Sequence, residues 1–188
     1  INSLFQMAAE SPERIQRMRT FLPLGDGFNY LLSGVAKAEI SLASTTQLYN
    51  PRTRNWSDKL LEAFDWPRAK FPELIPSGTR LGTLKPELAA ASGLGEIEVL
   101  ATCSHDTGAA VAAVPADGDQ WAYLSSGTWS LIGVELPEPI INDAARDLNF
   151  TNEIGHGNTV RLLRNIIGSW LVQECRREWS EDGKEYDY

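Results

Sequence analysis

The sequence predicts an α/β protein, and two observations lead to that class. The first half of the 188-residue chain contains several segments with helical spacing and helix-capping residues. From residue 96 onward, a strand-like run, an alanine-rich helix and two further strand-like runs follow one another. A turn-rich break at 116–119 separates the helix from the later strands. We therefore expect two parts, residues 1–118 and residues 119–188.

Helices in the first half are expected where a capping residue or a proline precedes apolar residues. Ser11 and Pro12 form one such start, and Ser57 forms another. Gly34 and Gly93 are favourable stops, because glycine adopts the left-handed conformation that ends many helices. The expected helices are 2–10, one that starts at Ser11–Pro12, 26–33, 57–64 and 86–92. The segment 71–83 contains two prolines and two glycines, which predicts a loop.

The stretch from residue 96 to residue 115 predicts a strand followed by a tightly packed helix. Glu96–Cys103 alternates at first and then becomes continuously apolar, as in a strand buried on at least one face. The alanine-rich segment 108–114 suits a helix that stops at Pro115. His105 and Asp106 lie at the junction between the two elements.

Asp106 is the first candidate site residue, because it lies at or near a helix N-terminus beyond a strand end. Ligands of open α/β sheets bind outside the carboxyl ends of strands, and the helix dipole favours an ionised carboxylate there. Such a carboxylate could accept the proton of a sugar hydroxyl during phosphoryl transfer. The competing interpretation is an ordinary helix cap, for which aspartate is among the preferred residues. His105 alone is more often a structural histidine than a catalytic one.

The second candidate lies in a predicted hairpin. Two strand-like runs, 121–125 and 129–135, flank Ser126 and Gly127, which predicts a hairpin turn between them. Backbone N–H groups at Gly127 and the Thr128 hydroxyl could contact a phosphate there. The chain contains no GxxxxGK[ST] phosphate loop, and any short Ser-Gly turn would look similar.

The third candidate lies in the segment 160–179, where apolar residues recur at spacings of three and four. This pattern predicts one amphipathic helix. Asn165 and Gln173 would lie within about 80° of each other on that helix, beside its apolar stripe. The two amides could bind hydroxyl groups or a nucleotide, or they could be solvated surface residues.

Composition excludes several classes of protein. The formal net charge of −8 argues against non-specific nucleic-acid binding, which uses basic patches. No apolar run is long enough to cross a bilayer, and the first residues show no secretory signal pattern. Cys103 and Cys175 make neither a disulfide framework nor a zinc site, so a reduced, cytoplasmic protein is the simplest expectation. The sequence does not set the oligomeric state.

The order and spacing of the motifs are more specific than any motif alone. They are SHDTGAAVAAVP, AYLSSGTWSLIGVE and TNEIGHGNTVRLLRNIIGSWLVQE, with earlier support from INSLFQMAAESP, FLPLGDGFNYLLSG and ASTTQLYNPRTRNWSDKLLEAF. On these residues the chain resembles the FGGY carbohydrate kinases, and within them the kinases that act on rhamnulose. The resemblance covers almost the whole chain, apart from the acidic tail after Ser180.

The resemblance implies a fold and a set of roles. FGGY kinases have two domains with an actin-like, ribonuclease-H-like core, and sugar and ATP meet in the cleft between them. Residues 1–118 would then be the C-terminal part of the N-terminal, sugar-binding domain, and residues 119–188 the start of the C-terminal, nucleotide-binding domain. Asp106 would be the general base, with His105, Thr107 and Asn165 lining the sugar site. Gly127, Thr128 and Gln173 would contact ATP, which would come with Mg²⁺ and no dedicated metal site.

The resemblance also implies what the chain lacks. The family's glycine-rich phosphate loop, which follows an aspartate near its start, is absent, and so is its later adenosine motif. The chain starts without an initiator methionine and resembles an internal piece of a two-domain kinase, incomplete at both ends, so little or no kinase activity is expected of it alone.

Several functions stay open. L-rhamnulose is the favoured substrate, with L-rhamnulose 1-phosphate as the product. Fuculose, xylulose and ribulose are the alternative sugars. A non-catalytic protein that binds a sugar or a nucleotide is a competing class, and so is a structural module whose polar residues are all caps and turns.

Overall fold

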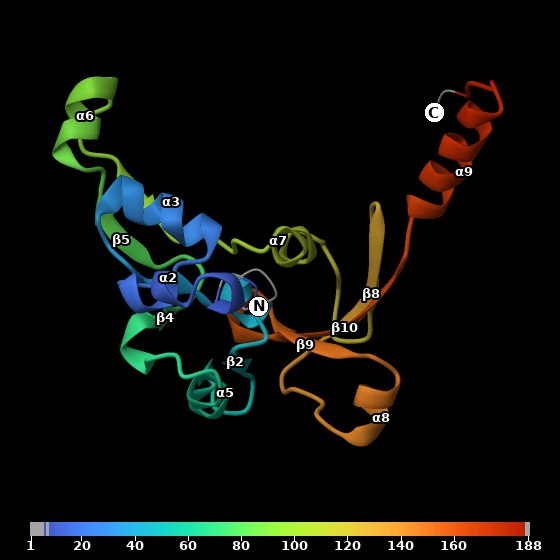
Figure 1. The fold of residues 1–188 in the computed structure, drawn as a ribbon, viewed down its shortest axis with the longest axis horizontal. Helices are drawn as coiled ribbons and strands as arrows, with labels where there is room; N and C mark the ends of the chain where they lie inside the picture. Colours follow the sequence, from blue (N-terminus) through green and yellow to red (C-terminus); the bar gives the residue numbers. More distant parts are fainter. Residues whose placement is uncertain (1–5, 7, 187–188) are drawn as a thin grey trace.

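The structure is a computed structural model that describes residue 6 and residues 8–186 (Figure 1). The helix expected at 2–10 lies mostly outside the described residues. The helices are α2 (Pro12–Arg17), α3 (Leu24–Ser33), α4 (Ile40–Ser44), α5 (Asp58–Ala63), α6 (Pro86–Ser92), α7 (Asp106–Ala112), α8 (Asp143–Asp147) and α9 (Trp170–Glu181). The strands are β1 (Ala38–Glu39), β2 (Tyr49–Asn50), β3 (Asn55–Trp56), β4 (Leu74–Ile75), β5 (Arg80–Thr83), β6 (Glu98–Leu100), β7 (Ala122–Ser126), β8 (Trp129–Leu136), β9 (Thr151–Ile154) and β10 (Val160–Ile167). Helices and sheets are mixed along the chain, so the α/β class is confirmed.

The helix boundaries in the first half follow from local chemistry. Gly34 ends α3 with a φ of 81°, and Gly93 ends α6 with a φ of 70°, as their positions predict. The Ser57 hydroxyl accepts a hydrogen bond from the Leu60 amide and caps α5. Helices α2, α4 and α5 pack around an aromatic core in which the rings of Trp56 and Phe71 lie 5.5 Å apart.

The loop expected at 71–83 was wrong, because two strands lie in it. β4 pairs in parallel with β1, and β5 pairs in antiparallel fashion with β6 across an irregularity between Arg80 and Gly82. Gly82 has a φ of 123°, so the glycine that suggested a loop instead allows an irregular strand. The partner strands lie far along the chain, and local sequence carries no sign of such pairings.

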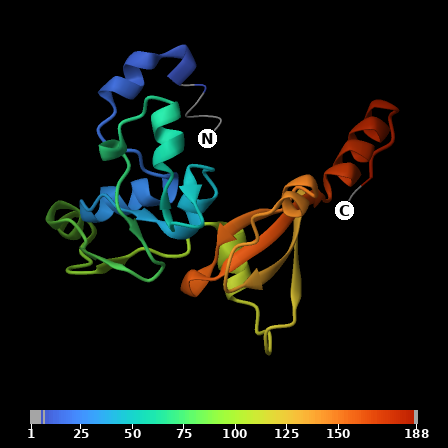
Figure 2. The ribbon, with the colours of Figure 1, turned by 90° about the horizontal axis from the view of Figure 1, so that it is seen from below.

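The second half contains an antiparallel sheet in the order β7-β8-β10-β9 (Figure 2). The hairpin β7–β8 is confirmed, and its last pair joins Ser126 to Ser130. Helix α7 packs on this sheet, where Val111 lies buried against Tyr123 and Leu163. Helix α7, at the end of the first half of the chain, therefore packs on the sheet formed by the second half.

The single helix expected at 160–179 was also wrong. Residues Val160–Ile167 form β10, which pairs with β8 along its whole length, and Gly168 separates this strand from α9. Val160 and Leu163 are fully buried, and so is Arg161 between them. A strand covered on both faces carries apolar residues in adjacent positions rather than in alternation. That arrangement imitated the three-to-four spacing of a helix.

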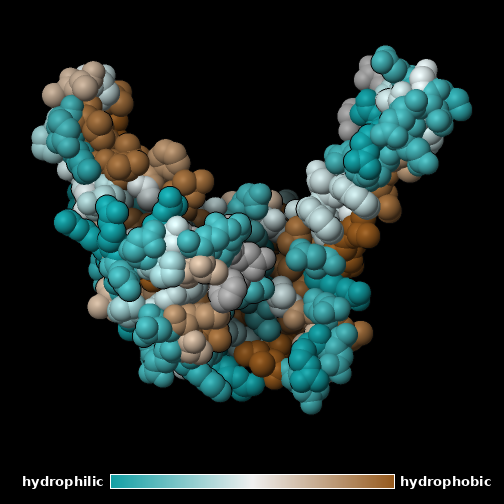
Figure 3. Space-filling view, viewed as in Figure 1, coloured by the Kyte–Doolittle hydropathy of each residue, from teal (hydrophilic) through white to brown (hydrophobic). Residues whose placement is uncertain are grey.

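Further contacts join the two halves on the other side of the sheet. The Ser44 hydroxyl at the end of α4 accepts a hydrogen bond of 2.9 Å from the Ile154 amide of β9. Ile40 and Tyr49 pack against Ile154 and Val160 in one buried cluster. Two arms, one of α3 and α6 and one of α9, rise from this base and leave a hollow between them (Figure 3). None of the described helices is long and apolar enough to span a membrane.

Candidate functional site

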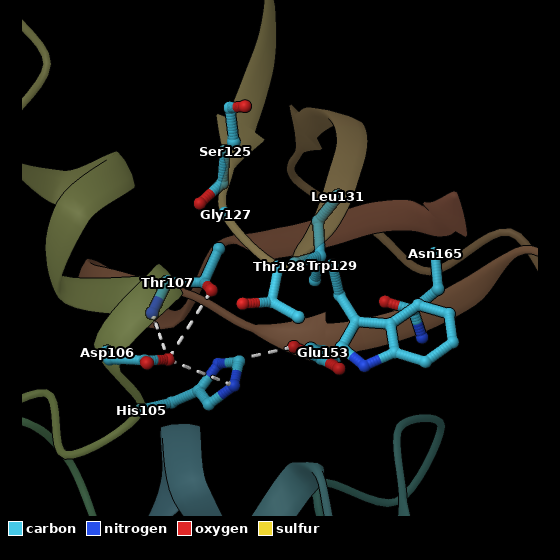
Figure 4. A pocket seen from close by; sticks show the side chains of 11 residues that line it. His105, Asp106, Thr107, Ser125, Gly127, Thr128, Trp129, Leu131, Glu153 and Asn165 are labelled. Carbon is cyan, nitrogen blue, oxygen red and sulfur yellow. Dashed lines mark hydrogen bonds and ion pairs between the residues drawn. The ribbon is translucent and has the colours of Figure 1, made fainter. Parts of the chain in front are cut away.

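A pocket of about 710 Å³ opens between the N-terminal end of α7 and the β7–β8 hairpin (Figure 4). Six of the seven residues singled out by the sequence line it, together with five others. The six are His105, Asp106, Thr107, Gly127, Thr128 and Asn165; the others are Ser125, Ser126, Trp129, Leu131 and Glu153. The three weak motifs therefore come together in one place.

Asp106 is the first residue of α7, as its position at the strand–helix junction predicts. His105 occupies the N-cap position, so Asp106 is not the N-cap of this helix. Its Oδ1 accepts a hydrogen bond of 2.6 Å from the Thr107 amide, and the Thr107 hydroxyl lies 3.4 Å away. Its Oδ2 accepts no hydrogen bond from any described residue, and the side chain is 96% exposed. One carboxylate oxygen is thus held in place while the other is free to accept a proton.

The backbone before Asp106 is anchored by Glu39, a fully buried carboxylate at the N-cap of α4. Glu39 accepts hydrogen bonds from Ser41, Leu42, Ser77 and the Ser104 amide, the last at 3.2 Å. The Ser41 hydroxyl in turn accepts a bond of 3.3 Å from the His105 amide. Because buried carboxylates are tolerated only when donors satisfy them, this network fixes the path of residues 104–105.

Asp26 extends this network. Its Oδ1 accepts the Glu39 amide at 3.1 Å, while its Oδ2 has no partner among the described residues. Burial raises the pKa of Asp26 to about 6, and the nearby Glu39 carboxylate adds to that rise. The Asp26 carboxyl group is therefore easily protonated just below neutral pH.

The His105 ring lies against two charged side chains from the sheet. Its Nδ1 is 2.8 Å from Nη2 of Arg161 on β10 and 3.4 Å from Oε2 of Glu153 on β9. Its Nε2 is 3.6 Å from Oδ1 of Asp106. Burial lowers the pKa of His105, the Arg161 guanidinium lowers it further, and the Glu153 carboxylate opposes both. The ring is therefore neutral at neutral pH.

The Gly127–Thr128 turn lines the pocket and has unpaired backbone donors. The Gly127 carbonyl accepts bonds from the amide and the hydroxyl of Ser169, and the Thr128 carbonyl accepts the Trp170 amide at 3.1 Å. The amide N–H groups of Gly127 and Thr128 donate to no other described residue. With its carbonyls engaged behind it, the turn offers unpaired N–H groups, as an anion requires.

Asn165 and Gln173 reach the site from different elements. Asn165 lies on β10 opposite Leu131 of β8 and lines the pocket. Gln173 lies on α9 and does not line it, but its Nε2 donates to the Thr128 hydroxyl at 3.4 Å. The expectation that they share one helix was wrong: Asn165 lines the pocket from a strand, and Gln173 contacts the turn from a helix.

The sequence reasoning missed Glu153, Trp129 and Arg161. Glu153 and Arg161 are directly opposite each other on β9 and β10, so a correct strand assignment would have paired them. Trp129 lies within the hairpin motif itself and lines the pocket. A large, exposed aromatic side chain next to Gly127–Thr128 could have indicated a binding residue. The described residues contain no group of three or more His, Cys, Asp or Glu side chains placed to hold a metal ion.

Comparison with known proteins identifies the family of the chain. The sequence model for the N-terminal domain of the FGGY family of carbohydrate kinases matches residues 4–113, and that for the C-terminal domain matches residues 122–188. A rhamnulokinase from Bacteroides thetaiotaomicron is 43% identical over 96% of this chain, and one from Bacillus subtilis is 42% identical over 96% of it. The chain covers 38% and 37% of those two relatives.

Solved structures show the same fold. A xylulose kinase from Rhodospirillum rubrum superposes with a TM-score of 0.73 over 95% of this chain and 37% of its own, at 18% identity. A carbohydrate kinase from Novosphingobium aromaticivorans gives 0.71 over 88% of this chain and 37% of its own, at 25% identity. The matched domains together cover nearly the whole sequence, and the chain belongs to the FGGY family of carbohydrate kinases.

Proposed function

We propose that the protein carrying this sequence transfers the γ-phosphoryl group of ATP to a ketose, with L-rhamnulose as substrate and L-rhamnulose 1-phosphate as product. The observation that supports this most directly is the free Oδ2 of Asp106, which faces a pocket that also contains the donor-rich turn. The two rhamnulokinase relatives favour rhamnulose over other ketoses. Residues 1–118 would supply the sugar side of the site and residues 119–188 the nucleotide side.

Asp106 would act as the general base. As the sugar hydroxyl oxygen forms its bond to the γ-phosphorus, Oδ2 takes the hydroxyl proton and the bond to the β-phosphate oxygen breaks. Thr107 holds Oδ1, so the free oxygen keeps its direction. His105 and Asn165 would line the bound sugar.

The turn at Gly127–Thr128 fits the phosphates of a nucleotide. Its unpaired N–H groups and the Thr128 hydroxyl can donate to phosphate oxygens, and Gln173 fixes that hydroxyl from α9. Mg²⁺ would arrive with the phosphates, since no described cluster of side chains is built to hold it. The ion would supply charge neutralisation on the phosphoryl groups.

Replacing Gly168 by alanine should weaken nucleotide binding. A Cβ atom at residue 168 would clash with the Gly127 carbonyl and would lie 2.5 Å from Oγ of Ser130. The turn must shift to make room, so we expect the Kd for ADP, measured by calorimetry, to rise about tenfold. Gly27→Ala is the matched control, because a Cβ there meets nothing within 4 Å and the residue lies in α3. Unchanged ADP affinity in Gly168→Ala would contradict the assignment of the turn.

The proposed activity is tested by coupled ADP release with a panel of ketoses. A full-length kinase that carries this sequence should release ADP fastest with L-rhamnulose and more slowly with fuculose, xylulose and ribulose. A higher kcat/KM with one of the other sugars would support the proposed class of reaction but assign a different substrate. Absence of ADP release with every ketose, while a sugar or ADP still binds, would replace the proposal with a non-catalytic binding protein.

A further inference from the structure

Arg161 is a fully buried cation that reaches from β10 to the underside of α7. Its Nη2 contacts His105 and Glu153, while Nε and Nη1 have no hydrogen-bond partner among the described residues. Gly108 in α7 leaves space for the guanidinium, because a Cβ atom there would lie 3.3 Å from Nη2. A buried charge with so few partners is costly, so its position needs an explanation.

The sheet supplies counter-charges for Arg161. In the strand register it lies opposite Glu153 of β9 and Glu135 of β8. The Glu153 Oε2 accepts a bond of 2.9 Å from Nη2, whereas Glu135 accepts the Thr159 hydroxyl. Glu153 lines the pocket, so this ion pair connects the pocket wall to the buried Arg161.

The contact between Arg161 and His105 fixes the protonation of the ring. Arginine carries only donors, so the 2.8 Å contact from Nη2 requires an unprotonated Nδ1 as acceptor. The neutral ring must then carry its proton on Nε2. That nitrogen lies 3.6 Å from Oδ1 of Asp106, the oxygen that Thr107 also holds.

We propose that Arg161 is a positioning residue for phosphoryl transfer, holding His105 as the neutral tautomer whose Nε2–H faces Asp106. In that state the ring directs a donor toward Oδ1, which lies 3.6 Å from Nε2, and leaves Oδ2 as the base. The inference depends on the proposed function, because it assigns Arg161 a role in the same reaction. The contact between Arg161 and His105 also joins the two family domains next to the reacting carboxylate, since Arg161 lies in the second matched region and His105 in the first.

Four charged groups face His105, from every element around it. Burial and Arg161 on β10 lower its pKa, whereas Glu153 on β9, Asp106 on α7 and Glu39 beside α4 raise it, and the net shift is downward. Protonation would place a proton on Nδ1, so the ring could no longer accept from Arg161 and two cations would lie in contact. Acid should therefore inactivate the site through protonation of His105.

The test measures how kcat/KM depends on pH in Arg161→Met and Glu153→Gln, within a full-length kinase that carries this sequence. The quantity compared is the pH at which kcat/KM falls on the acid side, here called the acid limb. Arg161→Met removes the donor and leaves Glu153 beside Nδ1, so the limb should move to higher pH. The ratio of kcat/KM at pH 8 to that at pH 6 should rise about tenfold. Glu153→Gln removes the opposing charge, so its limb should stay in place or move to lower pH. Arg161→Lys retains a cationic donor, so the pH of its acid limb should lie between those of the wild type and Arg161→Met.

Two results would overturn the proposal. One is a lower kcat in Arg161→Met with an unmoved acid limb, as loss of a structural contact would produce. The other is a shift of the limb in the same direction in both variants. If Arg161→Met does not fold, as judged by circular dichroism, the proposal still predicts an upward shift of the acid limb in Arg161→Lys and no upward shift in Glu153→Gln.

A spectroscopic measurement separates this proposal from the kinase assignment. The ¹⁵N shifts of His105, assigned by loss of the signal in His105→Asn, report the tautomer without turnover. A protonated Nε2 with no ketose phosphorylated by the wild type would retain the positioning contact and reject the proposed function. A protonated Nδ1 would reject the positioning role whatever the activity.

Discussion

Asp106→Asn should lower kcat for the ketose about 10³-fold, within the range typical of general bases. The amide keeps an oxygen that can accept the Thr107 N–H, so the turn into α7 should stay intact. The lost property is proton acceptance at Oδ2, which no other described carboxylate in the pocket can replace, because Glu153 is engaged by Arg161. Sugar binding, measured by calorimetry, should be retained, since the side chain keeps its size and polarity.

Asp143→Asn is the matched control for that change. Asp143 is likewise the first residue of a short helix, α8, and its side chain is 87% exposed. A purely local effect on the helix dipole would make the two variants alike, with a loss of about 0.5 kcal/mol in stability and little loss of activity. Equal activity of the two variants would therefore show that Asp106 is not the general base.

Glu39→Gln should destabilise the fold by about 3 kcal/mol, because buried donors lose a charged acceptor. Oε1 accepts the Ser41 amide and the Ser77 hydroxyl, and Oε2 accepts the Leu42 and Ser104 amides as well as the Ser41 hydroxyl. An amide group in either orientation points its NH₂ at one of these backbone N–H groups. Urea denaturation followed by fluorescence gives the free energy of unfolding directly.

Glu62→Gln on the exposed side of α5 is the control for Glu39→Gln, and we expect it to change stability by less than about 0.5 kcal/mol. The partially loosened Ser104 backbone should also lower kcat in Glu39→Gln at temperatures where the protein is still folded. A stable, fully active Glu39→Gln variant would show that the buried network does not hold the junction.

Local chemistry allowed much of the fold to be predicted. The hairpin at Ser126–Gly127 and the ends of α3 and α6 depend on glycine and turn residues whose preferences act within a few positions. The junction at Asp106 was predicted for the same reason, as a strand followed by an alanine-rich helix. These features needed no knowledge of distant partners.

Tertiary contacts decided the rest. β10 looked like a helix because both of its faces are covered near Leu163, which removes the alternation expected of a strand. The pair β1–β4 depends on residues more than thirty positions apart in the chain. Arg161 and Glu153 were overlooked for a related reason, since their importance arises only once β9 and β10 lie side by side.

β10 has a consequence for how the two proposed substrate sites can evolve. β10 carries Arg161 behind His105 and Asn165 in the pocket wall, and Gly168, which directly follows the strand, lies against the Gly127 carbonyl of the turn. Side chains of a strand alternate between its faces, so inserting or deleting one residue within it would turn the later residues to the wrong side. Length changes here would damage the sugar side and the nucleotide side in a single step. Substitutions in β10 can tune each site separately, whereas its length is tied to both at once.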